Sequence, residues 1–185
     1  MTTKPVNPPT YGQISHFFRL VEEGLVTGEN FQGFLEKPDQ FLRTKFPVLV
    51  NYGFNLVEMI ERGKYDWKND EITPKNFKIE GSGEIPVDLV LVHFGESITT
   101  QDVKQRLSDQ GLVSAKIEHL LAFGARYPEL QRKFPVVALG SGWVDSGNRD
   151  VPYLDEDVSK RGLDLDWDGP GNEWNDSYRF LALSK

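Results

Sequence analysis

The stretch VDLVLVHF, residues 87–94, has six apolar side chains among its eight positions. A short and almost continuous apolar run is typical of a strand that is buried on both faces of a sheet. The segment EGSGEIP, residues 80–86, comes before it and is predicted to form a turn or short hinge. We therefore expect a central strand at residues 87–94, entered through a turn.

Two helices are expected after this strand. Thr99 begins a capping-box pattern that opens the first helix, and Gly111 is expected to end it. Ser114 is expected to cap the second helix. Each helix has an apolar stripe at helical spacing. The residues of the two stripes are Val103, Leu107, Ile117, Leu120 and Leu121.

Four short strands are expected in the remainder of the chain, separated by loops that are rich in Gly and Asp. They cover residues 136–139, 151–154, 163–167 and 178–183. The order is then one strand, two helices and four strands. This order predicts an α+β fold.

The segment before the central strand is expected to be a small helical region of unknown role. Apolar residues recur at helical spacing in residues 11–43, and Leu56, Val57 and Ile60 indicate one more helix. We expect residues 1–80 to form this N-terminal region and residues 87–185 to form a separate ligand-binding domain. Candidate partners of the helices are a carrier, a virion component or a second copy of this chain.

The composition excludes several classes of protein. Because none of the 185 residues is cysteine, disulfides, thiolate metal sites and cysteine nucleophiles are excluded. The first residues lack the apolar core of a signal peptide, and no run approaches the ~20 apolar residues of a membrane-spanning helix. We expect a soluble protein without membrane insertion, either cytoplasmic or associated with a virion.

The net charge of −7 is concentrated in residues 144–178. This segment holds ten acidic and three basic residues, whereas the rest of the chain holds 18 of each. Binding of nucleic acid through its phosphates requires Lys and Arg on the contact surface, so we expect no nucleic-acid partner. The expected ligand is neutral, cationic or a metal ion.

Strict alternation marks the strand Leu163-Asp-Leu-Asp-Trp-Asp168. It predicts that the three apolar side chains face the core and that the three aspartates face the other side. One interpretation is a solvated edge strand whose charges prevent aggregation. The other is a recognition surface, in which case replacing the three aspartates together by Ser should leave folding intact.

Asp, Asn, Ser, Gly and Tyr fill 20 of the 35 positions from 144 to 178, a composition that suits both turns and recognition surfaces.

The motifs Gly140-Ser-Gly-Trp143 and Arg179-Phe-Leu-Ala182 follow the pair of expected helices. In these motifs and this pair of helices, the chain resembles the variable proteins of diversity-generating retroelements. The resemblance covers residues 87–185 and implies a C-type-lectin-like fold. It also implies a non-enzymatic role in ligand binding and protein–protein interaction. The hypervariable region, here residues 144–178, would be diversified at adenines by mutagenic reverse transcription, and the partner would be a protein or another surface ligand.

The resemblance, carried over position by position, divides the hypervariable region into candidate ligand-binding positions and structural anchors. The candidate positions are Val144, Asp145, Ser146, Asn148, Arg149, Asp150, Asp155, Glu156, Asp157, Asp164, Asp166, Asp168, Asn172, Glu173, Asn175, Asp176 and Ser177. The anchors are Trp143, Trp167, Trp174, Arg179 and Phe180.

The triplet Trp174-Asn-Asp176 leaves one alternative open, a calcium-dependent carbohydrate-binding module, because many C-type lectins hold calcium with Trp-Asn-Asp. Calcium requires six to eight oxygen ligands, and the Glu-Pro-Asn or Gln-Pro-Asp loop of those lectins is absent from this sequence. A second alternative is a catalytically inactive relative of formylglycine-generating enzymes, whose reaction needs active-site cysteines. The histidines His16, His93 and His119 are scattered, and the last two are expected to be buried structural residues. We therefore expect no catalytic residue, metal or cofactor.

Overall fold

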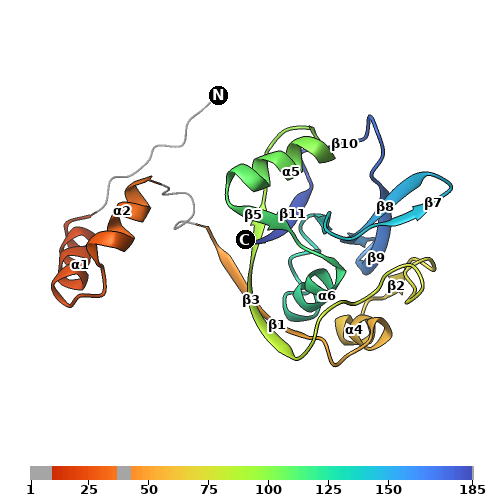
Figure 1. Ribbon diagram of the computed structural model, residues 1–185, viewed down its shortest axis with the longest axis horizontal. Helices are drawn as coiled ribbons and strands as arrows, with labels where there is room; N and C mark the ends of the chain where they lie inside the picture. Colours follow the sequence, from red (N-terminus) through yellow and green to blue (C-terminus); the bar gives the residue numbers. More distant parts are fainter. Residues whose placement is uncertain (1–9, 37–42, 185) are drawn as a thin grey trace. The chain divides into compact units, whose positions relative to one another are not determined.

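The computed structural model describes residues 10–36 and 43–184 (Figure 1). The chain forms two compact units, Met1–Arg43 and Thr44–Lys185. The boundary therefore lies near residue 43 and not near residue 80. Residues 44–80, which the sequence pattern assigned to a separate helical region, belong to the same unit as the sheet because two of their segments pair with its strands.

The first unit contains two helices, as the helical spacing predicted: α1 (Tyr11–Glu22) and α2 (Gly28–Glu36). Thr10 caps α1 through a reciprocal capping box with Gln13. No residue of α1 is buried, and Phe18 remains 59% exposed. The apolar stripe of α1 therefore stays open to solvent within this unit.

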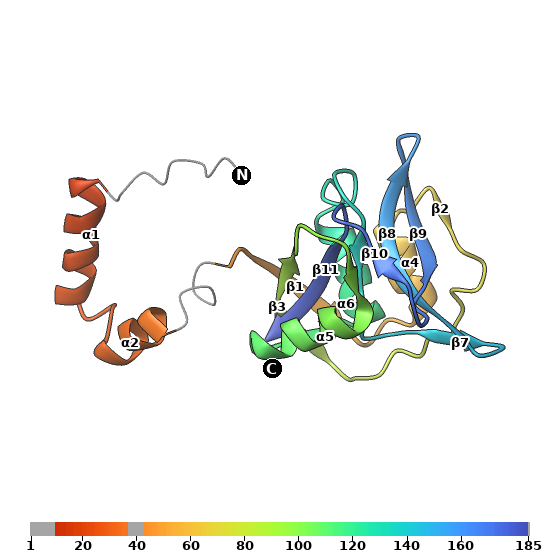
Figure 2. The same cartoon turned by 90° about the horizontal axis from the view of Figure 1, so that it is seen from above.

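The second unit is built on a mixed sheet whose strands follow the order β1-β3-β11-β6-β8-β9-β2. Figure 2 shows β1, β3 and β11 at one end of this sheet and β8, β9 and β2 at the other. The predicted central strand is β3 (Glu84–Val92), which begins three residues before the expected position and pairs antiparallel with β1 (Lys45–Asn51) and β11 (Arg179–Ser184). The first strand of the predicted lectin-like segment thus lies beside its last strand.

The other half of the sheet contains the strands of the acidic segment. β6 (Val136–Val137) pairs parallel with β11 and antiparallel with β8 (Asn148–Asp157). β8 pairs antiparallel with β9 (Lys160–Trp167), whose other edge pairs parallel with β2 (Trp67–Lys68). The short strands at the margins are β5 (Leu112–Ser114), β7 (Trp143–Asp145) and, in a separate pair, β4 (Ile98–Thr99) and β10 (Glu173–Trp174).

Helices cover both faces of the sheet, and neighbouring residues of one strand point to opposite faces. In β11, Leu181 joins the core formed with α6 (Ile117–Arg126) and α4 (Leu56–Gly63), whereas Phe180 joins the core formed with α5 (Thr100–Asp109). We call these the α6 core and the α5 core. The mixed α+β class expected from the sequence is therefore confirmed.

The caps of the two predicted helices differ in their outcome. Thr99 caps α5 by accepting a hydrogen bond from the backbone N–H of Asp102, as expected. Ser114 does not cap α6, because it pairs with β11 as part of β5. The N-cap position is Lys116, and the hydroxyl of Ser141 accepts a hydrogen bond from the backbone N–H of Ile117 at 2.9 Å. A distant loop thus supplies the acceptor that the local sequence pattern placed at Ser114.

Candidate functional site

The β8–β9 ribbon separates apolar from polar side chains by strand alternation. Tyr153 lies opposite Asp164, and Leu154 lies opposite Leu163. Because opposite residues of an antiparallel pair share a face, Tyr153, Asp164 and the alternate residue Asp155 lie on one face. Leu154 and Leu163 are buried on the other face, in the α6 core. For Leu163 the predicted alternation is therefore confirmed.

Two tyrosines hold the aspartates of β9 in place. The Tyr153 hydroxyl donates to Asp164 Oδ2 at 3.1 Å, and the Tyr178 hydroxyl donates to Asp166 Oδ2 at 3.0 Å. The side-chain amide of Asn69 donates to Asp164 Oδ1 at 2.8 Å. We name Tyr153, Asp155, Asp164, Asp166 and Tyr178 the acid–tyrosine row.

Both phenols of the row remain protonated donors at neutral pH. Burial, followed by the nearby Asp166 carboxylate, raises the pKa of Tyr178 to about 12. Burial and then the Asp164 carboxylate raise the pKa of Tyr153. Asp164 and Asp166 were expected from the sequence to be ligand-binding positions, and their hydrogen bonds to tyrosines were not predicted. The signal available in the sequence was the presence of two tyrosines within an otherwise acidic segment.

Asp155 is the member of the row with an unsatisfied acceptor. Its Oδ1 atom is buried and has no hydrogen-bond partner. Burial, and then the charges of Asp164 and Asp157, raise the pKa of Asp155 to about 6. A Cβ atom at Gly162 would lie 2.6 Å from Asp155 Oδ1 and 2.7 Å from the Trp67 ring. A side chain at position 162 would therefore clash with both groups, and glycine lets the Trp67 indole and the Asp155 carboxylate approach each other beside β9.

This pKa predicts how pH affects stability. The folded protein keeps the Asp155 proton up to about pH 6, whereas the unfolded chain releases it near the ordinary aspartate pKa of 3.8. The stability that this proton contributes is thus fully present below pH 3.8 and is lost as the pH rises to about 6. Urea denaturation between pH 3 and 8 should show Asp155→Asn gaining stability relative to the wild type across this window. The exposed Asp109→Asn is the control, and a difference that does not change with pH would contradict the assignment.

Asp168 and Arg149 form a structural ion pair, so neither is an exposed variable position as the resemblance implied. The Asp168 side chain is 3% exposed, pairs with the Arg149 guanidinium and accepts from the Thr100 hydroxyl. Arg149 also donates to the backbone carbonyls of Leu139 and Ser141, both at 3.1 Å. The Arg149–Asp168 ion pair therefore links the start of β8 to the end of β9.

The burial of Asp168 changes the expectation for the three aspartates of β9. Asp168→Asn leaves the Arg149 guanidinium without a counter-charge and should lower the free energy of unfolding by about 2 kcal/mol. Asp164→Asn retains the size and an acceptor oxygen of the side chain and should cost less than about 1 kcal/mol. Denaturant melts of the two variants check this difference. Equal stabilities would show that the ion pair contributes nothing.

The remaining candidate positions fall into two groups. Half-buried positions besides Arg149 and Asp168 are Asp150, Asp155, Glu156, Asp164, Asp166 and Asn172. Exposed positions are Val144, Asp145, Ser146, Asn148, Asp157, Glu173, Asn175, Asp176 and Ser177. Four of the exposed residues surround the β7–β8 turn, where Ser146 and Gly147 have φ angles of 50° and 88°. Two positive φ angles are typical of a tight type I′ hairpin turn, so these side chains are displayed on a short rigid tip.

The five expected anchors have different environments. Trp174 is 1% exposed and Phe180 is 2% exposed, so both are confirmed as buried. Trp143 packs half-buried against the α6 core, and the Arg179 guanidinium donates to the backbone carbonyls that precede it. Trp167 is 41% exposed and is not an anchor. Trp167 is the last residue of β9 and lies opposite the half-buried Asp150. Alternation places it on the same face as Leu163, but this end of the strand is not part of the α6 core.

The calcium triplet has no cluster of ligands around it. The side-chain oxygen of Asn175 accepts from the backbone N–H and the hydroxyl of Ser177, and Asp176 is exposed. Over residues 10–36 and 43–184 no group of three or more His, Cys, Asp or Glu side chains is placed to hold a metal ion. The same residues include no helix that is long and apolar enough to cross a lipid bilayer.

The two histidines that were expected to be buried differ. His93 lies just after β3 and is exposed, because the strand ends at Val92; its Nε2 is 2.8 Å from the backbone carbonyl of Asp176. His119 is buried, and its Nδ1 accepts from the backbone N–H of Lys116 at 3.2 Å. His119 is therefore a satisfied structural residue.

Comparison with known proteins does not identify a relative. No protein-family model, curated protein or solved structure matches this chain. The function is therefore inferred from the geometry of the chain's own residues.

Proposed function

We propose that this protein acts by binding rather than by catalysis, and that its acid–tyrosine row recognises a basic segment of a protein or peptide. The observation that carries this proposal is the pair of tyrosine–aspartate hydrogen bonds, which fix two carboxylates before any ligand arrives. A carboxylate has about four acceptor positions. Tyr153, Asn69 and the backbone N–H of Leu165 occupy three of these positions on Asp164. Tyr178 and the backbone N–H of Trp167 occupy two on Asp166, so Asp166 keeps more acceptors for the N–H groups of Lys or Arg than Asp164 does.

Three further features support a cationic ligand. Asp155 in the same row is half-buried and adds a third carboxylate to it, although its Oδ1 atom is itself buried. Trp67 is 36% exposed beside this carboxylate, and an aromatic face next to an acid favours an alkylammonium or guanidinium group. Residues 144–178 carry the whole net charge of −7 of the chain, so their field attracts cations.

The finer part of the proposal concerns the fold and the source of variation. We propose a C-type-lectin-like domain in which the exposed candidate positions form a hypervariable region of a diversity-generating retroelement. The antiparallel pair of β3 and β11, with α5 and α6 between them in sequence, supports this fold. The hairpin tip at Ser146 and the loop around Asn175 support display of variable side chains, because they are exposed and lie outside the cores.

The binding proposal is tested with a fluorescent tetralysine peptide, and tetraglutamate serves as its matched control. We expect the wild type to bind tetralysine at low ionic strength and the affinity to fall as salt screens the charges. The double variant Asp164→Asn, Asp166→Asn should bind at least tenfold more weakly, whereas the exposed Asp109→Asn on α5 should bind like the wild type. Equal affinity of the double variant and the wild type would reject the row as the binding surface.

The diversification proposal is tested in the DNA next to the gene. We expect a near-copy of the region that encodes residues 140–185, located beside a reverse-transcriptase gene. Differences between the copy and the gene should fall at adenines of the copy and at codons of the exposed positions. A locus without such a copy would reject diversification and leave the binding proposal to the peptide measurement.

A further inference from the structure

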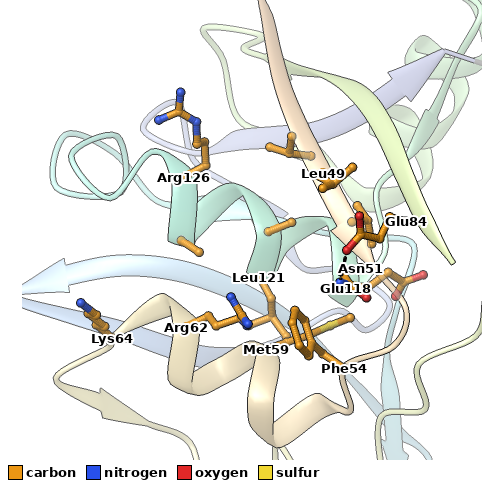
Figure 3. Close-up of a pocket in the computed structure, with 14 residues that line it drawn as sticks. Leu49, Asn51, Phe54, Met59, Arg62, Lys64, Glu84, Glu118, Leu121 and Arg126 are labelled. Atoms are coloured by element: carbon orange, nitrogen blue, oxygen red, sulfur yellow. Dashed lines mark hydrogen bonds between the residues drawn. The ribbon is translucent and has the colours of Figure 1, made fainter.

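A second candidate site lies on the α6 side of the sheet. It is a pocket of about 660 Å³ between β1, α4 and α6 (Figure 3). This volume is in the usual range for small-molecule sites. Apolar side chains form much of its wall, from Val48 and Val50 on β1, Met59 on α4, and Leu121 and Ala122 on α6.

The pocket wall includes a buried carboxylate that is only partly satisfied. Glu118, in the first turn of α6, is 1% exposed, and its Oε1 atom has no hydrogen-bond partner. His119 Nδ1 is 4.0 Å from Oε1 but accepts from the backbone N–H of Lys116, so that nitrogen carries no proton to donate. An unpaired buried carboxylate oxygen is costly, and a donor inside the pocket would satisfy it.

Charge is divided between the two sides of the pocket. In Figure 3, Glu118 lies on the same side as Glu84, which accepts from the side-chain amide of Asn51 at 2.5 Å. Lys64 and Arg126 line the opposite side. The pocket is therefore acidic at one side and basic at the other, and the wall between them is apolar apart from Arg62.

An aromatic ring lines the path between the two sides. The Arg62 guanidinium lies over the Phe54 ring, 3.7 Å from its centroid, and both residues line the pocket. The stacked pair keeps the Arg62 charge close to the apolar wall. A ligand whose apolar body contacts this wall would therefore lie near the Arg62 guanidinium and reach the Glu118 carboxylate at the acidic side of the pocket.

We infer that this pocket binds a small zwitterion with an apolar body, whose ammonium group donates to Glu118 and whose anionic group pairs with Lys64 and Arg126. The site is separate from the acid–tyrosine row, which lies on the other face of the β8–β9 ribbon. Each group of the ligand is complementary to one group of the pocket. The ammonium supplies the donor that Glu118 Oε1 lacks, the alkyl body covers Met59 and Leu121, and the anion meets the basic side.

Three probes with the same number of carbon atoms separate these contributions: 8-aminooctanoate, octylamine and octanoate. In isothermal titration calorimetry at neutral pH, we expect the zwitterion to bind at least tenfold more tightly than either single-charge probe. Glu118→Gln keeps the size of the side chain and should weaken 8-aminooctanoate and octylamine at least tenfold without weakening octanoate. Glu129→Gln, outside the pocket, is the matched control.

A filled pocket provides an independent variant if Glu118→Gln perturbs folding. Ala122→Phe places a ring where the alkyl body would lie and should abolish binding of all three probes. The double variant of the acid–tyrosine row should leave 8-aminooctanoate binding unchanged, so failure of one site is distinguishable from failure of the other. Absence of 8-aminooctanoate binding to the wild type at millimolar concentration, or equal binding to Glu118→Gln, would overturn the inference.

Discussion

Replacing Arg161 by Ala is expected to lower the free energy of unfolding by about 4 kcal/mol, among the largest effects of any single side chain here. Arg161 is 6% exposed and lies in β9. Its guanidinium donates to the backbone carbonyls of Gly63 and Gly124, both at 2.8 Å, and to the side-chain oxygen of Gln131 at 2.8 Å. Removing it would leave these buried acceptors without donors.

The carbonyls that accept from the Arg161 guanidinium explain why a buried cation is tolerated there. Gly63 ends α4, and Gly124 lies in the last turn of α6. The last carbonyls of a helix have no partner within the helix and carry the negative end of its dipole. One guanidinium therefore satisfies the ends of two helices and ties them to β9. Gln131 extends the connection by donating to the carbonyls of Asp155 and Gly162.

The measurement is chemical denaturation of Arg161→Ala beside two matched variants. Arg161→Lys keeps the charge but offers fewer donors in a different geometry, so it should recover only part of the loss. Arg132→Ala removes an exposed arginine that pairs with the exposed Glu129 and the half-buried Glu156, and should cost less than about 1 kcal/mol. A cost below about 1 kcal/mol for Arg161→Ala would show that the carbonyls rearrange to bond with water. A large cost would also loosen the ribbon that carries the acid–tyrosine row.

The strands and helices that could be predicted from the sequence are those whose pattern is local. The apolar run at 87–94 and the capping signal at Thr99 each gave the correct element, within a few residues. β1 was missed because Pro47 interrupts its apolar pattern. The structure places β1 at the edge of the sheet, where the missing backbone N–H of proline is tolerated. The position of a strand within a sheet is not encoded in its own residues, so this exception could not be predicted.

The arrangement of the candidate site depends on contacts between distant parts of the chain. Asn69 reaches Asp164 across 95 positions, and Asp66 accepts from the backbone N–H of Arg161 across 95 positions. The alternation of β9 indicated where the aspartates lie, but not that tyrosines and an asparagine hold them. Whether a polar side chain is unconstrained or bonded is decided by its tertiary neighbours, and single-sequence periodicity reports only its face.

The second large effect is expected at Trp174, where Trp174→Ala should lower the free energy of unfolding by about 3–5 kcal/mol. The side chain is 1% exposed in the α5 core, and its indole N–H donates to the Thr100 hydroxyl at 2.8 Å. The Tyr178 and Phe180 rings pack against it edge-on, with centroids at 5.1 and 6.1 Å. Truncation to alanine would leave a cavity in the α5 core and remove the N–H donor to Thr100.

Trp167 provides the matched control, because it is the same residue type and was expected from the sequence to be an equal anchor. With 41% of its surface exposed, Trp167→Ala should cost less than about 1.5 kcal/mol. Trp174 also contacts Tyr178, which donates to Asp166 in the acid–tyrosine row. Trp174→Phe should therefore fold and retain most of the stability while weakening tetralysine binding, because the hydrogen bond to Thr100 is lost and Tyr178 is less well held. Equal melting behaviour of Trp174→Ala and Trp167→Ala would contradict the assignment of Trp174 as the buried anchor of this face.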